Sequence, residues 1–292
     1  MAHKAGFINI IGNPNVGKST FLNAILGEKL SIVTSKAQTT RHRILGIYNE
    51  ENYQLIFSDL PGILDPHYKL QEKMLDFINQ ALTDADVFIY MVETGERKYN
   101  PEIVEKIKKS GIPVIVVINK VDKSEEAYIY KEMEYWKEVF PEADVIAISA
   151  LYNFNVDKVL NRIKELLPEH PPYFPKDEIS DRSIRFFLSE IIREKILLNF
   201  KQEIPYSVEV VIDNYKEEEN LVRVSAIIYV ARDSQKNILI GKKGEAIKKF
   251  ATQARLDMEK FLGKKVFLEV FVKVRKNWRD NEKDLSRFGY EI

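Results

Sequence analysis

The residues with the clearest chemical potential form one glycine-bearing loop, Gly12-Asn13-Pro14-Asn15-Val16-Gly17-Lys18-Ser19-Thr20. Such a loop points successive backbone N–H groups at phosphates, while its lysine reaches the β and γ oxygens and its hydroxyl binds Mg²⁺. An apolar run, residues 7–11, precedes the loop, and a helix-compatible run, residues 20–26, follows it. Because a helix N-terminus favours anions, the sequence predicts a site for the phosphates of a nucleotide.

A second short motif, Asp59-Leu60-Pro61-Gly62, follows the apolar run 54–58. We expect Asp59 to hold the magnesium through a water molecule, because a carboxylate at the end of a parallel strand faces the ligand side of an open sheet. Gly62, which has no Cβ, is expected to offer its N–H to the γ-phosphate and to move when that phosphate leaves. The alternative is an ordinary turn, and the position of the motif after Lys18 favours the metal role.

A third motif, Asn119-Lys120-Val121-Asp122, ends the apolar run 113–118. The carboxylate of Asp122 accepts from both the ring N–H and the exocyclic amine of guanine, whereas adenine offers no such donor pair. Asn119 is expected to tie this loop to the phosphate loop, and the stem of Lys120 to lie along the base. Ser149, Ala150 and Leu151 follow the run 145–148. We expect them to form the remaining wall of the base site, with the Ala150 amide near the guanine carbonyl. The predicted ligand is therefore a guanine nucleotide.

A polar segment, residues 36–43, lies between the first two motifs and has no sustained apolar period. Thr40 is our choice for the second hydroxyl on magnesium, and Thr39 is the alternative. If the γ-phosphate orders this segment and hydrolysis releases it, the site works as a switch.

Hydrolysis needs little covalent help, because the lysine, the loop amides and magnesium spread the developing charge. The predicted catalytic residues are Lys18, Thr40, Gly62 and Asn15. Ile63 follows Gly62, where Ras-like switches carry a glutamine that orients the attacking water. We therefore expect slow intrinsic turnover, raised by a partner surface or by a monovalent cation.

The motifs Gly-Asn-Pro-Asn-Val-Gly-Lys-Ser, Gln-Thr-Thr-Arg-His-Arg, Asp-Leu-Pro-Gly-Ile and Asn-Lys-Val-Asp together resemble the Era family of bacterial GTPases, over essentially all 292 residues. The resemblance implies a Mg²⁺-dependent GTPase with an RNA-binding KH domain, which acts in assembly of the 30S ribosomal subunit through the 3′ region of 16S rRNA. It implies no DNA partner and leaves peripheral association with the inner membrane open. Related GTPases use an asparagine at the position of Asn15 as a potassium ligand; the alternative is that Asn15 only shapes the turn.

Composition agrees with this interpretation. The chain is 45% apolar and 30% charged, as is ordinary for globular proteins, and it contains no cysteine. The lack of cysteine excludes disulfides and thiolate chemistry, and the four histidines are scattered without ligand spacing. No apolar run is long enough for a membrane span, so we expect a cytoplasmic protein.

Alternating strands and helices over residues 7–167 predict an α/β fold, with a mostly parallel, doubly wound sheet. Residues 168–175 hold four of the eleven prolines and read as the start of a semi-rigid linker. We therefore expect a nucleotide-binding domain over residues 1–170, a linker over 171–182 and a second domain over 183–292.

The second domain reads as helix, strand, strand, helix, helix, strand, which predicts an α+β KH domain of type II. Ile240-Gly241-Lys242-Lys243-Gly244 forms a tight turn between two helical runs, and its glycines allow close approach to a nucleic-acid backbone. The charge distribution supports contact with a nucleic acid, since residues 236–279 hold 13 Lys or Arg against 4 Asp or Glu, whereas the whole chain has a net charge of zero.

Further RNA-binding candidates follow the turn. Lys248 is one, although it and its neighbours also fit a solvated helix face. The others lie near the C-terminus and join cations to an indole that could stack on a base: Lys273, Arg275, Lys276, Trp278 and Arg279. Trp278 equally fits a cap on the domain core, and the family resemblance favours RNA contact for this segment.

Two functions remain open. In the first, GTP binding and hydrolysis set the RNA occupancy of the KH domain. In the second, the protein is an RNA-binding assembly module whose nucleotide site is largely structural.

Overall fold

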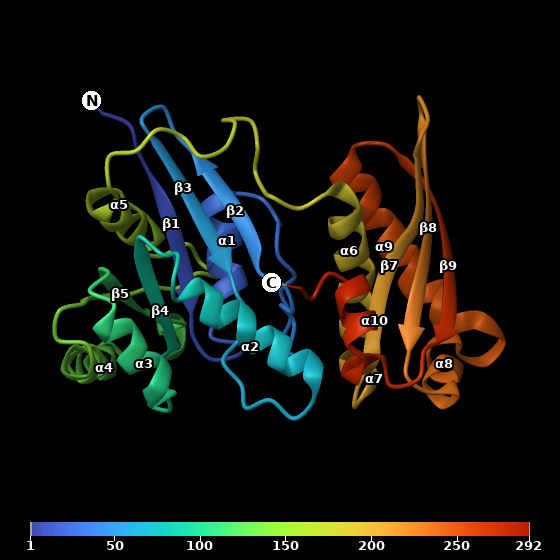
Figure 1. The fold of residues 1–292 in the computed structure, drawn as a ribbon, viewed down its shortest axis with the longest axis horizontal. Helices are drawn as coiled ribbons and strands as arrows, with labels where there is room; N and C mark the ends of the chain where they lie inside the picture. The colour runs from blue at the N-terminus through green and yellow to red at the C-terminus, as the bar shows by residue number, and fades with distance from the viewer. Residues whose placement is uncertain (1, 292) are drawn as a thin grey trace. The chain divides into compact units, whose positions relative to one another are not determined.

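The computed structural model describes residues 2–291, which divide into two compact units (Figure 1). The first unit comprises residues 2–65 and Met74–Asp181, and the second comprises Pro66–Lys73 and Arg182–Glu291. Residues 171–181, which the sequence suggests are a linker, therefore belong to the first unit.

The first unit is built on a six-stranded sheet of order β2-β3-β1-β4-β5-β6. All neighbours are parallel except β2, which pairs antiparallel with β3. The central strands are buried along nearly their whole length, as expected of a parallel sheet covered on both faces. The strands are β1 (Lys4–Ile11), β2 (Ile44–Asn49), β3 (Tyr53–Asp59), β4 (Val87–Glu93), β5 (Val114–Asn119) and β6 (Asp144–Ala147).

Five helices cover this sheet. Right-handed crossovers put α1 on one face and α2, α3 and α4 on the other, and α5, which follows the last strand, contacts α1. Their bounds are α1 Lys18–Leu26, α2 Lys69–Ala81, α3 Pro101–Lys109, α4 Glu126–Val139 and α5 Val156–Leu166. Because β1, β3 and β5 are parallel, the three motifs that follow them emerge at one edge of the sheet.

The second unit has a three-stranded sheet in which β7 (Val208–Glu217) and β8 (Leu221–Val230) are antiparallel, and β8 and β9 (Lys265–Val274) are parallel. Helices α6 (Ile184–Asn199), α8 (Asp233–Ile240) and α9 (Glu245–Leu262) pack on it around an apolar core that includes Leu188, Val224 and Phe250. Two short helices, α7 (Ile204–Ser207) and α10 (Glu282–Arg287), complete the unit. Among the residues that the model describes, no helix is both long and apolar enough to cross a bilayer.

Candidate nucleotide site and RNA surface

The phosphate loop joins β1 to α1 and depends on two close backbone contacts. A Cβ on Gly12 would lie 2.1 Å from the Met91 carbonyl oxygen, and one on Gly17 would lie 2.1 Å from Nδ2 of Asn119. Gly17 also has a left-handed φ of 106°, and Asn15 has a φ of 66°. Both glycines are therefore required by the geometry, not merely by the flexibility of a loop.

Lys18 is buried at the start of α1, with only 6% of its surface exposed. Its ammonium donates to the carbonyl oxygens of Gly12 at 3.0 Å and Asn13 at 2.8 Å, so the loop holds it beside the space where phosphates would bind. Burial lowers the pKa of Lys18 to about 8, and the nearby carboxylates of Asp59 and Glu96 limit that fall.

This shift predicts a pH-dependent nucleotide affinity. Bound phosphates favour the ammonium form of Lys18, so its pKa rises when the nucleotide binds. GTP affinity should therefore be constant below about pH 8, where Lys18 is protonated both in the free protein and in the complex. Above that pH the free protein loses the proton and the complex keeps it, so GTP affinity should fall by about tenfold per pH unit. Calorimetry between pH 7.5 and 9 in two buffers of different ionisation enthalpy should detect proton uptake. Constant affinity without proton uptake would contradict the assigned role of Lys18.

The three predicted magnesium residues meet at the end of the loop. Ser19 Oγ donates to Asp59 Oδ2 at 2.7 Å, and Thr40 Oγ1 lies 3.0 Å from Ser19 Oγ and 3.3 Å from Asp59 Oδ2. Thr39, the alternative, instead bonds to Thr34 Oγ1 at 2.7 Å and to the Lys36 carbonyl at 2.6 Å. The geometry favours Thr40.

This cluster fits a hard cation. Asp59 is fully buried, burial raises the pKa of its carboxyl, and its Oδ1 atom has no hydrogen-bond partner. An unpartnered carboxylate oxygen beside two hydroxyls is unfavourable in a protein interior unless an ion or its water binds there. Oxygen donors of this kind are what Mg²⁺ prefers.

Gly62 packs directly against the phosphate loop. A Cβ at this position would come within 2.6 Å of the nitrogen and Cα of Pro14, and Ile63 N donates to Gly12 O at 3.2 Å. Ile63 is 7% exposed and brings no polar side-chain atom to the site. The structure therefore gives the attacking water no partner at position 63.

The base loop is fixed mainly by Asn119. Its Nδ2 donates to the Val16 carbonyl at 2.8 Å, which ties the loop to the phosphate loop as expected. Its Oδ1 accepts from the Ala150 N–H at 2.9 Å, so that amide, expected near the guanine carbonyl, already has a protein partner. Ser149 Oγ donates to Asp122 Oδ1 and thereby orients the carboxylate predicted to read guanine.

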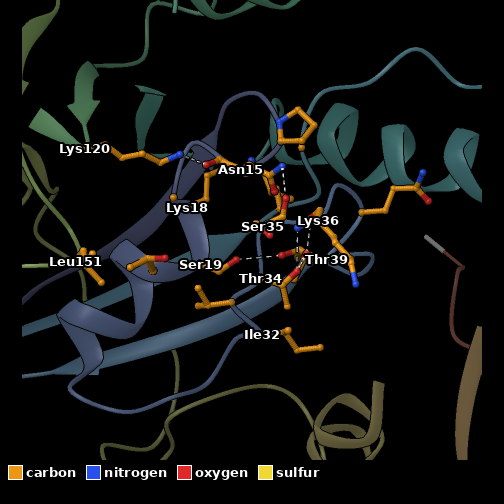
Figure 2. Close-up of a pocket in the computed structure, with 18 of the residues that line it drawn as sticks. Asn15, Lys18, Ser19, Ile32, Thr34, Ser35, Lys36, Thr39, Lys120 and Leu151 are labelled. Atoms are coloured by element: carbon orange, nitrogen blue, oxygen red, sulfur yellow. Dashed lines mark hydrogen bonds between the residues drawn. The ribbon is translucent and has the colours of Figure 1, made fainter. Parts of the chain in front are cut away.

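Other side chains brace the same loops. Lys120 donates to the Asn15 carbonyl at 2.6 Å and forms an ion pair with Glu93, and Asn13 donates to Glu96 at 2.7 Å. Asn15 itself donates to the Ser35 carbonyl at 3.1 Å, which connects the phosphate loop to the residue directly before the polar segment (Figure 2).

A cavity of about 430 Å³ collects most of the predicted residues. It is lined by part of the phosphate loop, residues 32–36 and 38–40, Gly62, Lys120 and the exposed Leu151 (Figure 2). Asp122 and Ser149 line a neighbouring hollow of about 680 Å³ together with Tyr152 and Phe154. Sequence reasoning missed Ile32 and Val33, whose apolar side chains line the cavity without any motif to mark them.

In the second unit, the turn between α8 and α9 has the backbone that the sequence predicts. Gly241 and Gly244 have φ values of 72° and 79°, and a Cβ on Gly241 would lie 2.6 Å from Cβ of Ala246. Lys242 and Lys243 are exposed at the tip, and Ile240 is half-buried behind them. Lys248 is exposed on the first turns of α9.

The C-terminal segment differs from the sequence-based expectation. Trp278 is fully buried, and its indole N–H donates to the Ser207 carbonyl at 3.2 Å, so it has no free face on which a base could stack. Arg275 forms a bidentate ion pair with Asp284, whose closest contact is 2.6 Å. The prediction of RNA stacking on Trp278 is therefore wrong: the indole caps the core. Lys273 and Lys276 are exposed, and Arg279 is half-buried.

Comparison with known proteins agrees with both halves of this description. Residues 7–120 match the family model described as a 50S ribosome-binding GTPase, and residues 203–279 match the KH domain model. GTPase Era of Syntrophus aciditrophicus (strain SB) is 47% identical over 291 residues, which cover 98% of this chain and 95% of that protein. The chain belongs to the Era family of GTPases.

Two crystal structures of Era proteins share the whole fold. One, in complex with MgGDPNP and nucleotides 1506–1542 of 16S ribosomal RNA, is 39% identical with a TM-score of 0.95 and covers 99% of this chain and 100% of its own. The other, a variant of Aquifex aeolicus Era bound to GDP.AlF4−, is 38% identical with a TM-score of 0.94 and the same coverage. The predicted α/β GTPase domain followed by a KH domain is confirmed.

Proposed function

We propose that this Era-family GTPase binds GTP with Mg²⁺, hydrolyses it to GDP and phosphate, and uses the nucleotide state to control binding of its KH unit to 16S rRNA near the 3′ end. The process served is assembly of the 30S subunit. One observation of this chain carries the switch: Thr40, on the polar segment, contacts Ser19 Oγ and Oδ2 of the buried Asp59, whose second carboxylate oxygen, Oδ1, has no hydrogen-bond partner. With an assembling 30S subunit as partner, the proposed site of action is the cytoplasm.

In this proposal the phosphate loop and Lys18 bind the β and γ phosphates, and Ser19, Thr40 and Asp59 hold the magnesium, which neutralises charge as the phosphate leaves. Asp122, oriented by Ser149, selects guanine. Gly62 offers its N–H to the γ-phosphate. Its tight contact with Pro14 means that only a residue without a Cβ fits there.

The RNA half of the proposal is supported by exposed lysines and glycine geometry at the turn 241–244, and by the related Era structure that holds nucleotides 1506–1542 of 16S rRNA. Backbone clamping at such a turn tolerates many sequences, so the choice of RNA must be measured. Crosslinking the GTP-loaded protein in cells and sequencing the bound RNA should recover the 3′ end of small-subunit rRNA. Recovery of unrelated RNA alone would contradict the assigned partner.

We further propose that potassium activates hydrolysis through Asn15. The side chain of Asn15 already bridges the phosphate loop to Ser35, at 3.1 Å, so a cation held there would lie between the nucleotide and the polar segment. Ile63 supplies no polar group to orient the attacking water, and a cation near the phosphates would instead raise the rate by neutralising charge that develops in the transition state.

The expected result is a hydrolysis rate at least about tenfold higher in potassium than in sodium, and loss of that difference in Asn15→Ala. Single-turnover GTP hydrolysis at equal ionic strength measures it, with Asn13→Ala as the control, since Asn13 faces Glu96 instead. Equal rates in the two salts would remove this role from Asn15.

A further inference from the structure

Residues 173–174 are clamped to the first unit by one buried side chain. Gln54, fully buried on β3, accepts from the N–H groups of Tyr173 at 2.7 Å and Phe174 at 2.9 Å through Oε1. Its Nε2 donates to the Phe174 carbonyl at 2.8 Å. The segment expected to be a spacer is therefore fixed where it passes β3.

The next residues continue along the open edge of β2. Ile47 N donates to the Ile179 carbonyl at 2.9 Å, and Leu45 N donates to Asp181 Oδ1 at 3.1 Å. Ser180 Oγ donates to the Leu45 carbonyl at 2.6 Å, and Asn49 Nδ2 donates to the Glu178 carbonyl at 3.1 Å. Residues 178–181, which we call the edge strap, thus lie along β2, joined to it by one isolated antiparallel bridge between Gly46 and Ser180 and by side-chain hydrogen bonds.

The edge strap links two functional segments: it is bonded to β2, which follows the polar segment, and it directly precedes the KH unit in the sequence. β2 begins at Ile44, four residues after Thr40, whose hydroxyl lies 3.0 Å from Ser19 at the predicted magnesium site. At its other end, Asp181 is separated by a single residue from Ser183, which caps the first helix of the KH unit, α6. The strap is therefore bonded to the start of β2 directly before that unit begins.

We propose that the edge strap transmits the nucleotide state from the polar segment, residues 36–43, to the KH unit. When Thr40 is ordered at the magnesium and γ-phosphate, the start of β2 is fixed and Leu45 presents both its N–H and its carbonyl to Ser180 and Asp181. When the segment is released, Leu45 loses that fixed position, the strap loosens, and the free chain before α6 lengthens by several residues. This inference rests on the proposed switch and adds the element that carries its signal.

Two backbone amides report the state of the strap directly. In the antiparallel β2–β3 pair, the N–H groups of Leu45 and Ile47 point away from β3 and bond to the strap instead. Their hydrogen exchange, measured by NMR on the full chain, should be at least about tenfold slower with GDPNP and Mg²⁺ than with GDP. Residues 38–41 should become protected in the same comparison.

The exchange pattern distinguishes failure of the edge strap from failure of the switch. Protection at residues 38–41 without any change at Leu45 and Ile47 would overturn the strap while leaving the switch intact. No change in either segment would overturn both.

The double variant Ser180→Ala/Asp181→Ala tests the consequence for RNA. It removes the two side-chain anchors at Leu45 and replaces no residue assigned to the nucleotide, so GTP affinity and basal hydrolysis should stay within about twofold of the parent. Its RNA affinity should no longer differ between GDPNP and GDP. The control Asp177→Ala removes an exposed carboxylate directly before the edge strap and should keep the difference. A double variant that retains the full difference would overturn the proposal.

Discussion

Asp122→Asn is expected to lower GTP affinity by about 100- to 1000-fold and to make xanthosine triphosphate the preferred ligand. In the proposed base site the carboxylate accepts from two N–H donors of guanine, and hydrogen bonds to a charged group contribute about 1.5–3 kcal/mol each. An amide instead presents one donor, which matches the extra carbonyl of xanthine. Ser149 Oγ, which donates to Asp122 in this structure, can still donate to the amide oxygen, so the loop should keep its shape.

Titration of GTP and xanthosine triphosphate by calorimetry checks this expectation. Glu126→Gln makes the same carboxylate-to-amide change on a residue that lines the same hollow and has no assigned contact with the base, so it should leave both affinities unchanged. Unaltered GTP binding in the Asp122 variant would contradict the assignment of base recognition.

Gly17→Ala is expected to abolish measurable nucleotide binding and to lower the free energy of unfolding by about 3–8 kcal/mol. The new Cβ would lie 2.1 Å from Nδ2 of Asn119 and would displace the side chain that joins the phosphate loop to the base loop. The buried Val16 carbonyl and Ala150 N–H would then lose their partner, at a cost of about 1–3 kcal/mol each. The left-handed backbone at residue 17 adds about 1–2 kcal/mol.

Gly27→Ala is the matched control, because Gly27 ends the same helix in a left-handed conformation with φ 69° and has open space where a Cβ would go. It should cost only about 1–2 kcal/mol, from backbone strain, and should bind GTP normally. Urea unfolding and calorimetry compare the two variants. Equal losses of stability and unimpaired GTP binding in both would show that the contact with Asn119 is unimportant.

The nucleotide half of the molecule was readable from sequence because its residues lie in short motifs that follow apolar strands. Asp59 and Asn119 were placed by such strands, and the structure brings both to the phosphate loop. The choice of Thr40 over Thr39 could not be derived from sequence spacing alone. It depends on which hydroxyl the folded segment turns toward Ser19.

Contacts between residues far apart in the sequence determine the features that the sequence did not predict. Trp278 lies among cations in the sequence, and this pattern suggests a residue that stacks on a base. In the structure it folds onto Ser207, 71 residues earlier, because burying a large indole is more favourable than leaving it exposed to solvent. The edge strap could not be predicted from sequence either. The proline-rich residues before it suggest a spacer, and the residues of β2 that bond to the strap are about 135 positions away in the chain.

The most direct test of the central claim, that nucleotide state controls RNA binding, is the affinity of the full chain for an RNA of the small-subunit 3′ end under three conditions. These are GDPNP with Mg²⁺, GDP with Mg²⁺, and no nucleotide, measured by fluorescence anisotropy at fixed ionic strength. The account predicts binding at least about tenfold tighter with GDPNP than in the other two. Identical affinities in all three conditions would contradict it and would favour an RNA-binding module whose nucleotide site is structural.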